Sequence, residues 1–281
     1  MYLLKNKKFP IIDLMKLNFF FDIDGTILPV GKHIPKSTLD AFEKAGSLGH
    51  RLFFCTGRSP FELTDELRAL PFDGGVFSSG AHVVVDGKTI FSKCLNAEQR
   101  AFFFSVVERF DLLWILQSDD GSYLTQEAQD FYCDLTRQVY SRSIDFLGFH
   151  IVDSFPVDKP IVKMFILSKK GLVLEARKAF EGPLHSVNNT NGLSAECAAE
   201  LMAPDLTKAS GIAHILSYLG EDASSTVGIG DGENDIEMIE TCNLGIAMGN
   251  SCDELKEKAD YVTSDIEDDG LAKAMEYAMR G

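Results

Sequence analysis

The stretch NFFFDIDGTILP, Asn18–Pro29, places two aspartates directly after a run of apolar residues. The run Leu17–Phe21 has the length and composition of a buried strand. Asp22 and Asp24 follow it at positions i and i+2, which point to the same side of an extended chain. Two like charges repel each other, so the pair indicates a hard cation held by carboxylate oxygens, or two carboxylates that divide catalytic roles. The alternative is an acidic turn that leaves a strand.

The segments on both sides of this stretch alternate between strand and helix patterns. Short apolar runs have the length of buried strands, and the segments between them repeat apolar residues at helical spacing. Such alternation predicts a parallel sheet covered by helices on both faces. The predicted strands are 17–21, 52–55, 75–78, 226–229, 244–248 and 261–262, and the predicted helices are 37–48, 61–70, 208–219, 235–240, 253–258 and 270–279.

The middle of the chain has a different pattern. The run HVVVDGKTIFSK contains Asp86-Gly87 between two β-rich arms, which predicts a hairpin. Helical and strand-like segments then follow in α+β order up to about residue 203. We therefore predict an α/β fold with a Rossmann-like parallel-sheet core domain from 1–81 and 204–281, and an inserted α+β domain from 82–203. Residues 1 to about 15 are expected to form a loosely organised extension.

Composition limits the classes of partner. The net charge of -15 and the pI near 4.8 argue against sequence-independent nucleic-acid binding and against an anionic membrane surface. No apolar run approaches the ~20 residues that a membrane helix needs. Six cysteines are scattered without a CxxC pair, so we expect reduced thiols and a cytoplasmic protein.

Two further segments could bind an anion. In Cys55-Thr56-Gly57-Arg58, a hydroxyl and the N–H of a glycine follow the second predicted strand and can form an anion cradle. An ordinary strand-to-helix turn, in which Thr56 caps, is the alternative. Lys208 lies in the first turn of a predicted helix, which is the unfavourable end of the helix dipole for a cation. That position indicates a lysine that faces an anion, although a solvated lysine is the alternative.

The stretch GIGDGENDIEMI, 228–239, carries three polar residues in a glycine-rich turn after an apolar strand. Asp231 and Asp235 are four residues apart at a helix start, so both can face one point, and a metal would offset their repulsion. The stretch lacks the third glycine of GxGxxG, and the chain has no GxxxxGK[ST] loop. His33 and Cys242 occupy the twelfth positions that an EF-hand requires to be acidic. A plain acidic turn is the alternative.

Together the segments DIDGT (22–26), TGR (56–58), Lys208 and GDGEND (230–235) resemble, in order and spacing, the haloacid dehalogenase superfamily of phosphotransferases. The insertion resembles the type IIB cap of Cof-type sugar-phosphate phosphatases. Position by position, the resemblance implies that Asp22 is the nucleophile that forms an aspartyl-phosphate and that Asp24 is the general acid and base. It assigns phosphate binding to Thr56, Gly57, Lys208 and Asn234, the last by orienting Lys208 or the phosphate. It assigns Mg²⁺ to Asp22, the carbonyl of Asp24, Asp231 and Asp235.

The resemblance thus implies a Mg²⁺-dependent phosphatase that hydrolyses a small phosphorylated metabolite, in particular a sugar phosphate. A phosphomutase or phosphotransferase on the same site is an alternative. So is a phospho-acceptor signalling module, although an acid/base at Asp24 would hydrolyse its phosphate; a silent binding protein is a third. The chain departs from the family at Ser79-Gly80-Ala81, where Asn-Gly-Ala is usual, and at Ala209, where glycine is common. The polar candidates for substrate selection, each with a solvated or turn role as its alternative, are His82, Asn188, Asn189, Asn191 and Glu196.

Overall fold

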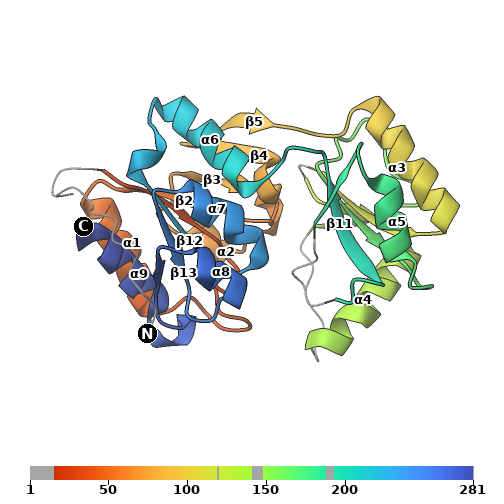
Figure 1. Cartoon of the computed structure of the whole chain (residues 1–281). Helices are drawn as coiled ribbons and strands as arrows, with labels where there is room; N and C mark the ends of the chain where they lie inside the picture. The colour runs from red at the N-terminus through yellow and green to blue at the C-terminus, as the bar shows by residue number, and fades with distance from the viewer. Residues whose placement is uncertain (1–15, 119, 141–147, 188–192, 281) are drawn as a thin grey trace. The chain divides into compact units, whose positions relative to one another are not determined.

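The structure is a computed structural model that describes residues 16–118, 120–140, 148–187 and 193–280. The predicted extension, residues 1–15, lies outside the described residues. The chain divides into two compact units, whose helices and strands are labelled in Figure 1. The core unit comprises Met1–Gly57, Thr64–Phe91 and Thr207–Gly281, and the inserted unit comprises Arg58–Leu63 and Ser92–Leu206.

The core unit is built on an eight-stranded sheet of order β14-β13-β12-β1-β2-β3-β4-β5. The strands from β14 to β3 are parallel to one another, and β4 is antiparallel to β3. The α/β class with a parallel-sheet core is therefore confirmed. The bounds are β1 Asn18–Phe21, β2 Arg51–Cys55, β3 Gly74–Phe77, β4 His82–Val85, β5 Lys88–Ser92, β12 Thr226–Gly230, β13 Leu244–Ala247 and β14 Tyr261–Val262.

Helices cover both faces of this sheet because its strands are apolar on both sides. Phe21 of β1 packs edge-on against Phe42 of α1, with ring centroids 5.2 Å apart, and α9 lies beside α1 (Figure 1). Phe20 points to the opposite face, where it joins the core beneath α6, α7 and α8. Alternate residues of one strand thus hold two helical layers. The bounds are α1 Lys36–Ser47, α6 Lys208–Leu219, α7 Ile236–Thr241, α8 Asp253–Lys258 and α9 Gly270–Arg280.

The predicted hairpin forms, but it belongs to the core sheet. Asp86 and Gly87 have φ of +49° and +72°, as a two-residue hairpin turn with both central residues left-handed requires. β4 pairs with β3, so these strands extend the core sheet, and the long segment of the inserted unit begins at Ser92 rather than at residue 82. The turn residues specify a hairpin but carry no information about which sheet it joins. The inserted unit ends at Leu206, close to the predicted edge at 203.

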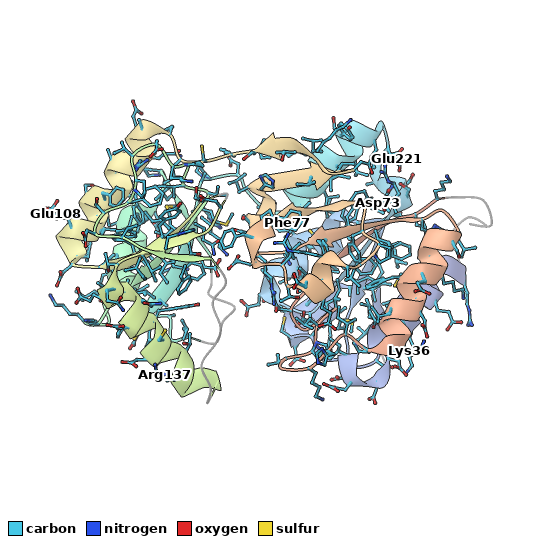
Figure 2. The ribbon with its side chains drawn as sticks, turned by 180° about the vertical axis from the view of Figure 1, so that it is seen from behind. Lys36, Asp73, Phe77, Glu108, Arg137 and Glu221 are labelled. Atoms are coloured by element: carbon cyan, nitrogen blue, oxygen red, sulfur yellow. The ribbon has the colours of Figure 1, made fainter. Side chains whose placement is uncertain are left out.

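The inserted unit has a six-stranded sheet of order β10-β11-β9-β6-β7-β8, antiparallel except between β7 and β8. On one face Ala128 and Tyr132 of α4 pack on the sheet, and on the other Phe104 of α3 contacts Trp114. Glu108 on α3 and Arg137 on α4 mark the polar sides of these helices (Figure 2). The bounds are β6 Leu113–Gln117, β7 Ser122–Leu124, β8 Phe149–Ile151, β9 Lys163–Leu167, β10 His185–Val187, β11 Ala198–Met202, α3 Ala97–Phe110, α4 Gln126–Tyr140 and α5 Val173–Phe180.

The single helix predicted over 61–70 is wrong. Two short turns replace it, the 3-10 turn η1 at Pro60–Glu62 and α2 at Asp65–Arg68. Leu63 between them is extended, and the Thr64 hydroxyl caps a new start by accepting from the Leu67 N–H. The other 3-10 turns are η2 Ser78–Gly80, η3 Ala223–Ser225, η4 Glu233–Asp235 and η5 Ile266–Asp268. Among the described residues, no helix combines the length and the apolar character that crossing a bilayer takes. All six cysteines are unpaired, as expected.

Candidate active site

The acidic residues lie where the order of the strands reverses. From β1 the chain proceeds outward through β2 and β3, and it later returns with β12 on the other side of β1. In open α/β sheets, ligands bind beyond the carboxyl ends of strands at such a point. Asp22 follows β1 directly, and its N–H donates to the carbonyl of Ile229 on β12 at 3.0 Å. Asp231 follows β12, so the two acidic loops leave the sheet side by side.

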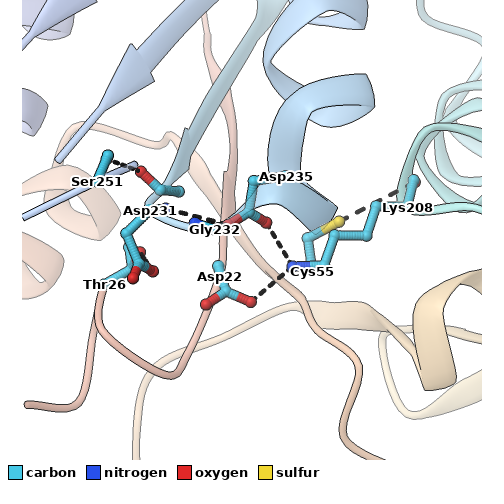
Figure 3. Close-up of polar contacts among 9 residues, drawn as sticks. Asp22, Thr26, Cys55, Lys208, Asp231, Gly232, Asp235 and Ser251 are labelled. Carbon is cyan, nitrogen blue, oxygen red and sulfur yellow. Dashed lines mark hydrogen bonds and ion pairs between the residues drawn. The ribbon is translucent and has the colours of Figure 1, made fainter. Parts of the chain in front are cut away.

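Lys208 joins two of the aspartates. Its Nζ donates to Oδ1 of Asp22 at 2.6 Å and to Oδ1 of Asp235 at 2.5 Å, and its side chain is 1% exposed (Figure 3). The lysine is the first residue of α6, whose start is capped by the Thr207 hydroxyl, which accepts from the Ser210 N–H at 3.1 Å. The cap fixes the first turn of the helix, and thereby directs the lysine toward the carboxylates instead of solvent. The lysine therefore faces carboxylates and not solvent, and its contact with a phosphate remains a prediction.

The loop after β12 is organised by Asp235. Its Oδ2 accepts from the N–H groups of Asp231 and Gly232, both at 3.0 Å (Figure 3). Gly230 permits this close turn, because a Cβ at that position would lie 2.5 Å from Cγ of Asp235. One carboxyl oxygen of Asp235 therefore shapes the loop that carries Asp231, while the other binds Lys208.

The turn after Asp22 reaches the same loop. The Thr26 hydroxyl donates to Oδ1 of Asp231 at 2.9 Å (Figure 3). Gly25 has φ of +87°, and a Cβ there would lie 2.2 Å from Oδ2 of Asp231. Both the backbone conformation and the space therefore require glycine at this position. The DIDGT and GDGEND segments, which are far apart in the sequence, therefore contact each other directly.

The carboxylates at this site outnumber the ammonium group among them. Burial is the largest cause and raises the pKa of Asp22 well above its ordinary value, although Lys208 lowers that pKa; the neighbouring carboxylates add to the rise. Burial and the nearby Asp235 raise the pKa of Asp231 to about 7. Burial opposes the charge of Lys208, but attraction to Asp22 and Asp235 prevails, so its pKa lies above the ordinary value. A permanent ammonium thus stands among carboxylates that outnumber it.

Three of these carboxylates could hold a divalent cation. Asp22, Asp231 and Asp235 each offer one oxygen, and these three oxygens all lie within 4.8 Å of one another. Opposite ligands of an octahedral Mg²⁺ are separated by about 4.2 Å, twice the ligand distance of about 2.1 Å. An all-oxygen donor set with excess negative charge is also what this hard cation prefers. The donor chemistry and spacing therefore fit Mg²⁺.

The segment predicted to form an anion cradle follows β2 at the same edge of the sheet. Thr56 is buried, its N–H donates to the carbonyl of Val76, and its own carbonyl accepts from the Ser79 N–H at 3.0 Å. Gly57 lies next to Ser79, whose Oγ would be 3.4 Å from a Cβ at Gly57. Ser79 has φ of +50°, a conformation that asparagine tolerates better than serine. The departure from Asn-Gly-Ala thus falls beside the predicted phosphate-binding loop.

Two candidates stand apart from the carboxylate group. Asp24 is exposed, and its side chain is not among the three carboxylates that lie close together. The prediction for the metal concerned its backbone carbonyl, and that remains a prediction. Asn234 is also exposed, and Lys208 is oriented by Asp22 and Asp235 rather than by Asn234. A contact between Asn234 and a phosphate remains a prediction.

The structure describes two of the five candidates for substrate selection, and neither is placed at the carboxylate group. Asn188, Asn189 and Asn191 lie outside the described residues. Glu196 is exposed, and His82 is half-buried beside the Thr89 hydroxyl.

Sequence reasoning missed one group at the site, the loop Met248–Cys252 after β13. Ser251 Oγ donates to the Gly230 carbonyl at 3.3 Å (Figure 3), and Asn250 binds the Gly25 carbonyl. Its place at the carboxyl end of a predicted parallel strand was the signal that could have identified it.

Comparison with known proteins agrees with this geometry. The profile of a family described as haloacid dehalogenase-like hydrolase matches residues 19–275. The chain is 29% identical over 265 residues to "Putative phosphatase YkrA" of Bacillus subtilis (strain 168), covering 91% of this chain and 95% of that protein. It is 25% identical over 266 residues to 5-amino-6-(5-phospho-D-ribitylamino)uracil phosphatase YcsE of the same organism, covering 91% and 93%.

Solved structures share the fold over nearly the whole chain. One is a sugar phosphatase of haloacid dehalogenase subclass IIB, with a TM-score of 0.75 and 25% identity, covering 93% of this chain and 98% of that one. Another comes from work on a conserved trigonal-bipyramidal intermediate in a phosphoryl-transfer superfamily, with a TM-score of 0.76 and 26% identity, covering 94% and 98%.

An open parallel sheet with a lysine and clustered carboxylates at its switch point defines an enzyme of the phosphoryl-transfer type. The chain belongs to the haloacid dehalogenase-like hydrolase family, and its Cof-type resemblance is confirmed.

Proposed function

We propose that this enzyme is a Mg²⁺-dependent phosphatase that hydrolyses a small phosphorylated metabolite through an aspartyl-phosphate on Asp22. The observation that carries the proposal is the position of Lys208, whose ammonium contacts Asp22 and Asp235, with Asp231 within reach of the same point. Three segments far apart in the sequence converge there, namely residues 22–26, Lys208 and residues 230–235. A purely structural ion pair would not need the additional, uncompensated carboxylates.

In the proposed mechanism, a carboxylate oxygen of Asp22 attacks phosphorus, and the bond from phosphorus to the leaving alcohol breaks. Asp24 gives its proton to that alcohol. Asp24 then takes a proton from water, whose oxygen attacks the aspartyl-phosphate and releases inorganic phosphate and Asp22. The exposed position of Asp24 supports this role, since the group must exchange protons with an alcohol and then with water.

Lys208 and the Thr56–Gly57 loop would bind the phosphoryl oxygens, with Asn234 as a further contact. Lys208 is held by two carboxylates, so its charge is fixed before the substrate arrives and needs no reorganisation. Asp22, Asp231, Asp235 and the carbonyl of Asp24 would hold Mg²⁺, which when bound offsets the repulsion between the carboxylates and a phosphate dianion.

For the substrate we propose a sugar phosphate or a similar polyhydroxylated phosphate ester. Two relatives support this class: one is a sugar phosphatase, and the other is named for a substrate with a phosphorylated ribityl chain. We also propose that the inserted unit selects the substrate. A cytoplasmic location, supported by the six free cysteines, completes the proposal. A screen of phosphorylated metabolites for phosphate release would identify the substrate, and a mutase would be recognised by isomer formation without free phosphate.

The direct test is release of inorganic phosphate from an aryl phosphate, with Mg²⁺ and with EDTA. We expect activity with Mg²⁺ and almost none with EDTA. Asp24→Asn should slow both steps and allow phosphorylated enzyme to accumulate, which mass spectrometry of the peptide containing Asp22 can detect. Equal activity in EDTA, or a phosphorylated residue other than Asp22, would refute the proposal.

A further inference from the structure

The loop Met248–Cys252 connects β13 to α8 and binds both acidic loops. The Met248 N–H donates to the Gly230 carbonyl at 3.0 Å, and the Cys252 N–H donates to the Asp231 carbonyl at 3.2 Å. Asn250 reaches in the other direction, since its Nδ2 donates to the Gly25 carbonyl at 2.8 Å. One short segment therefore holds the GDGEND loop by two backbone N–H groups and the Ser251 hydroxyl, and the DIDGT turn by the Asn250 side chain alone.

Both ends of the Asn250 amide are in use. Its Oδ1 accepts from the Ile266 N–H at 3.0 Å, while its Nδ2 meets a carbonyl, which can only accept. These two partners fix the orientation of the amide, because the reverse arrangement would place acceptor against acceptor and donor against donor. An aspartate could replace the acceptor function but not the donor function.

The carbonyl that Asn250 holds belongs to a residue with little freedom to move. Gly25 lies so close to Asp231 that a Cβ would be 2.2 Å from its Oδ2, and the next residue, Thr26, donates to Oδ1 of Asp231. A shift of the Gly25 peptide would therefore displace the Asp231 carboxylate or break the Thr26 contact. Asp24 precedes Gly25 directly, one peptide unit before the carbonyl that Asn250 holds, so the position of Gly25 also restricts the backbone from which the Asp24 side chain begins.

From these contacts we propose that Asn250 is a positioning residue for the active site, one that fixes the Asp24–Gly25 turn against Asp231. The inference rests on the proposed function. It states that Asn250 sets the spacing between the proposed metal ligands and the proposed acid/base, although its side chain contacts none of them. Residues that orient metal ligands typically change metal affinity or activity by 10- to 100-fold when they are removed.

The test compares Asn250→Ala with Asn243→Ala. Asn243 is an exposed asparagine immediately before β13, at the opposite end of the same strand. For Asn250→Ala we expect a fall in kcat of about 10- to 100-fold at saturating Mg²⁺, and a similar rise in the Kd for Mg²⁺ measured by calorimetry without substrate. Substrate KM should change less than about threefold, because Thr56 and Lys208 are untouched.

Asn250→Asp separates this role from a merely structural one. It keeps the acceptor for Ile266 but loses the donor to Gly25, so kcat should fall as in Asn250→Ala. If Asn250 served only to support Ile266, Asn250→Asp would match the wild type.

Equal kcat and Mg²⁺ affinity in Asn250→Ala and Asn243→Ala would overturn the inference while leaving the phosphatase intact. A wild-type protein that neither binds Mg²⁺ nor releases phosphate would overturn both.

Discussion

The core unit and the inserted unit both bury charged side chains, but in different proportions. At the edge of the core sheet, Lys208 lies among Asp22, Asp235 and the partly buried Asp231. In the inserted unit, Lys163 of β9 and Glu200 of β11 are both buried and lie 3.4 Å apart, one charge of each sign. Removing a charge from water is costly unless an opposite charge compensates it. The balanced pair can be explained by folding alone, whereas the unbalanced group indicates a ligand that supplies the missing positive charge.

The largest effect on activity is expected for the substitution Asp22→Asn. Loss of the nucleophile should reduce kcat by at least about 10⁴-fold. The variant also removes one carboxylate from an excess of them, so its melting temperature in EDTA should equal or exceed that of the wild type. Phosphate release and thermal unfolding, measured on the same preparation, check both parts. A variant with substantial activity would exclude Asp22 as the nucleophile.

The next largest effect is expected for Lys208→Met, which removes the ammonium and leaves buried carboxylates uncompensated. Breaking a buried ion pair from one side typically costs about 3–5 kcal/mol. Urea unfolding in EDTA should show a loss of this size, and saturating Mg²⁺ should recover part of it. Unchanged stability in EDTA would mean that the carboxylates are adequately solvated without the lysine.

A smaller effect concerns pH in the metal-free protein. The pKa of Asp231 is raised to about 7, above the value near 3.9 of an unfolded aspartate. Between these values the folded chain holds a proton that the unfolded chain has lost, so stability should fall as pH rises from about 4 through about 7. Asp231→Asn lacks this contribution, and its free energy of unfolding relative to wild type should increase over the same range in EDTA. Parallel pH profiles for the two proteins would contradict the assignment.

The smallest effect is expected when the balanced pair is removed as a whole. Replacing a buried ion pair by apolar residues of similar size is often neutral. The double variant Lys163→Met/Glu200→Met should therefore unfold within about 1 kcal/mol of the wild type. Mg²⁺ should raise the free energy of unfolding of the double variant and of the wild type by the same amount. A large loss of stability, or a loss of Mg²⁺ stabilisation, would remove the distinction between the two buried groups.

The sequence predicted much of the core unit because local and global signals agree there. The helix bounds 208–219 and 253–258 match α6 and α8. In α6 the Thr207 cap, the apolar face and Gly220 at the end act together. Asp22, Thr56 and Asp231 lie at one edge because the carboxyl ends of the parallel strands β1, β2 and β12 share it. Lys208 instead reaches Asp22 and Asp235 from the start of α6. That edge rule does not specify side-chain contacts, so Asn250 was not identified.

The structure differs from the sequence-based predictions mainly in elements that depend on residues distant in the sequence. β8 contains only Phe149–Ile151, and it is a strand because it pairs with β7, which no local pattern of three residues can reveal. The hairpin at 82–92 was recognised from its turn, but its place beside β3 depends on tertiary pairing. The helix predicted over 61–70 failed because Thr64 competes as a cap within an apolar pattern.

The central position of β1 has a consequence for protein synthesis. Asn18 of β1 pairs with Thr226 of β12, and the residues between them include the entire inserted unit. A ribosome therefore produces Asp22 long before Lys208, Asp231 and Asp235. Under the proposed mechanism, a nascent chain carries a nucleophile that has neither its ammonium partner nor its ligand set. Hydrolysis of cellular phosphate esters thus begins only after translation of the C-terminal segment, when β12 can take its place beside β1.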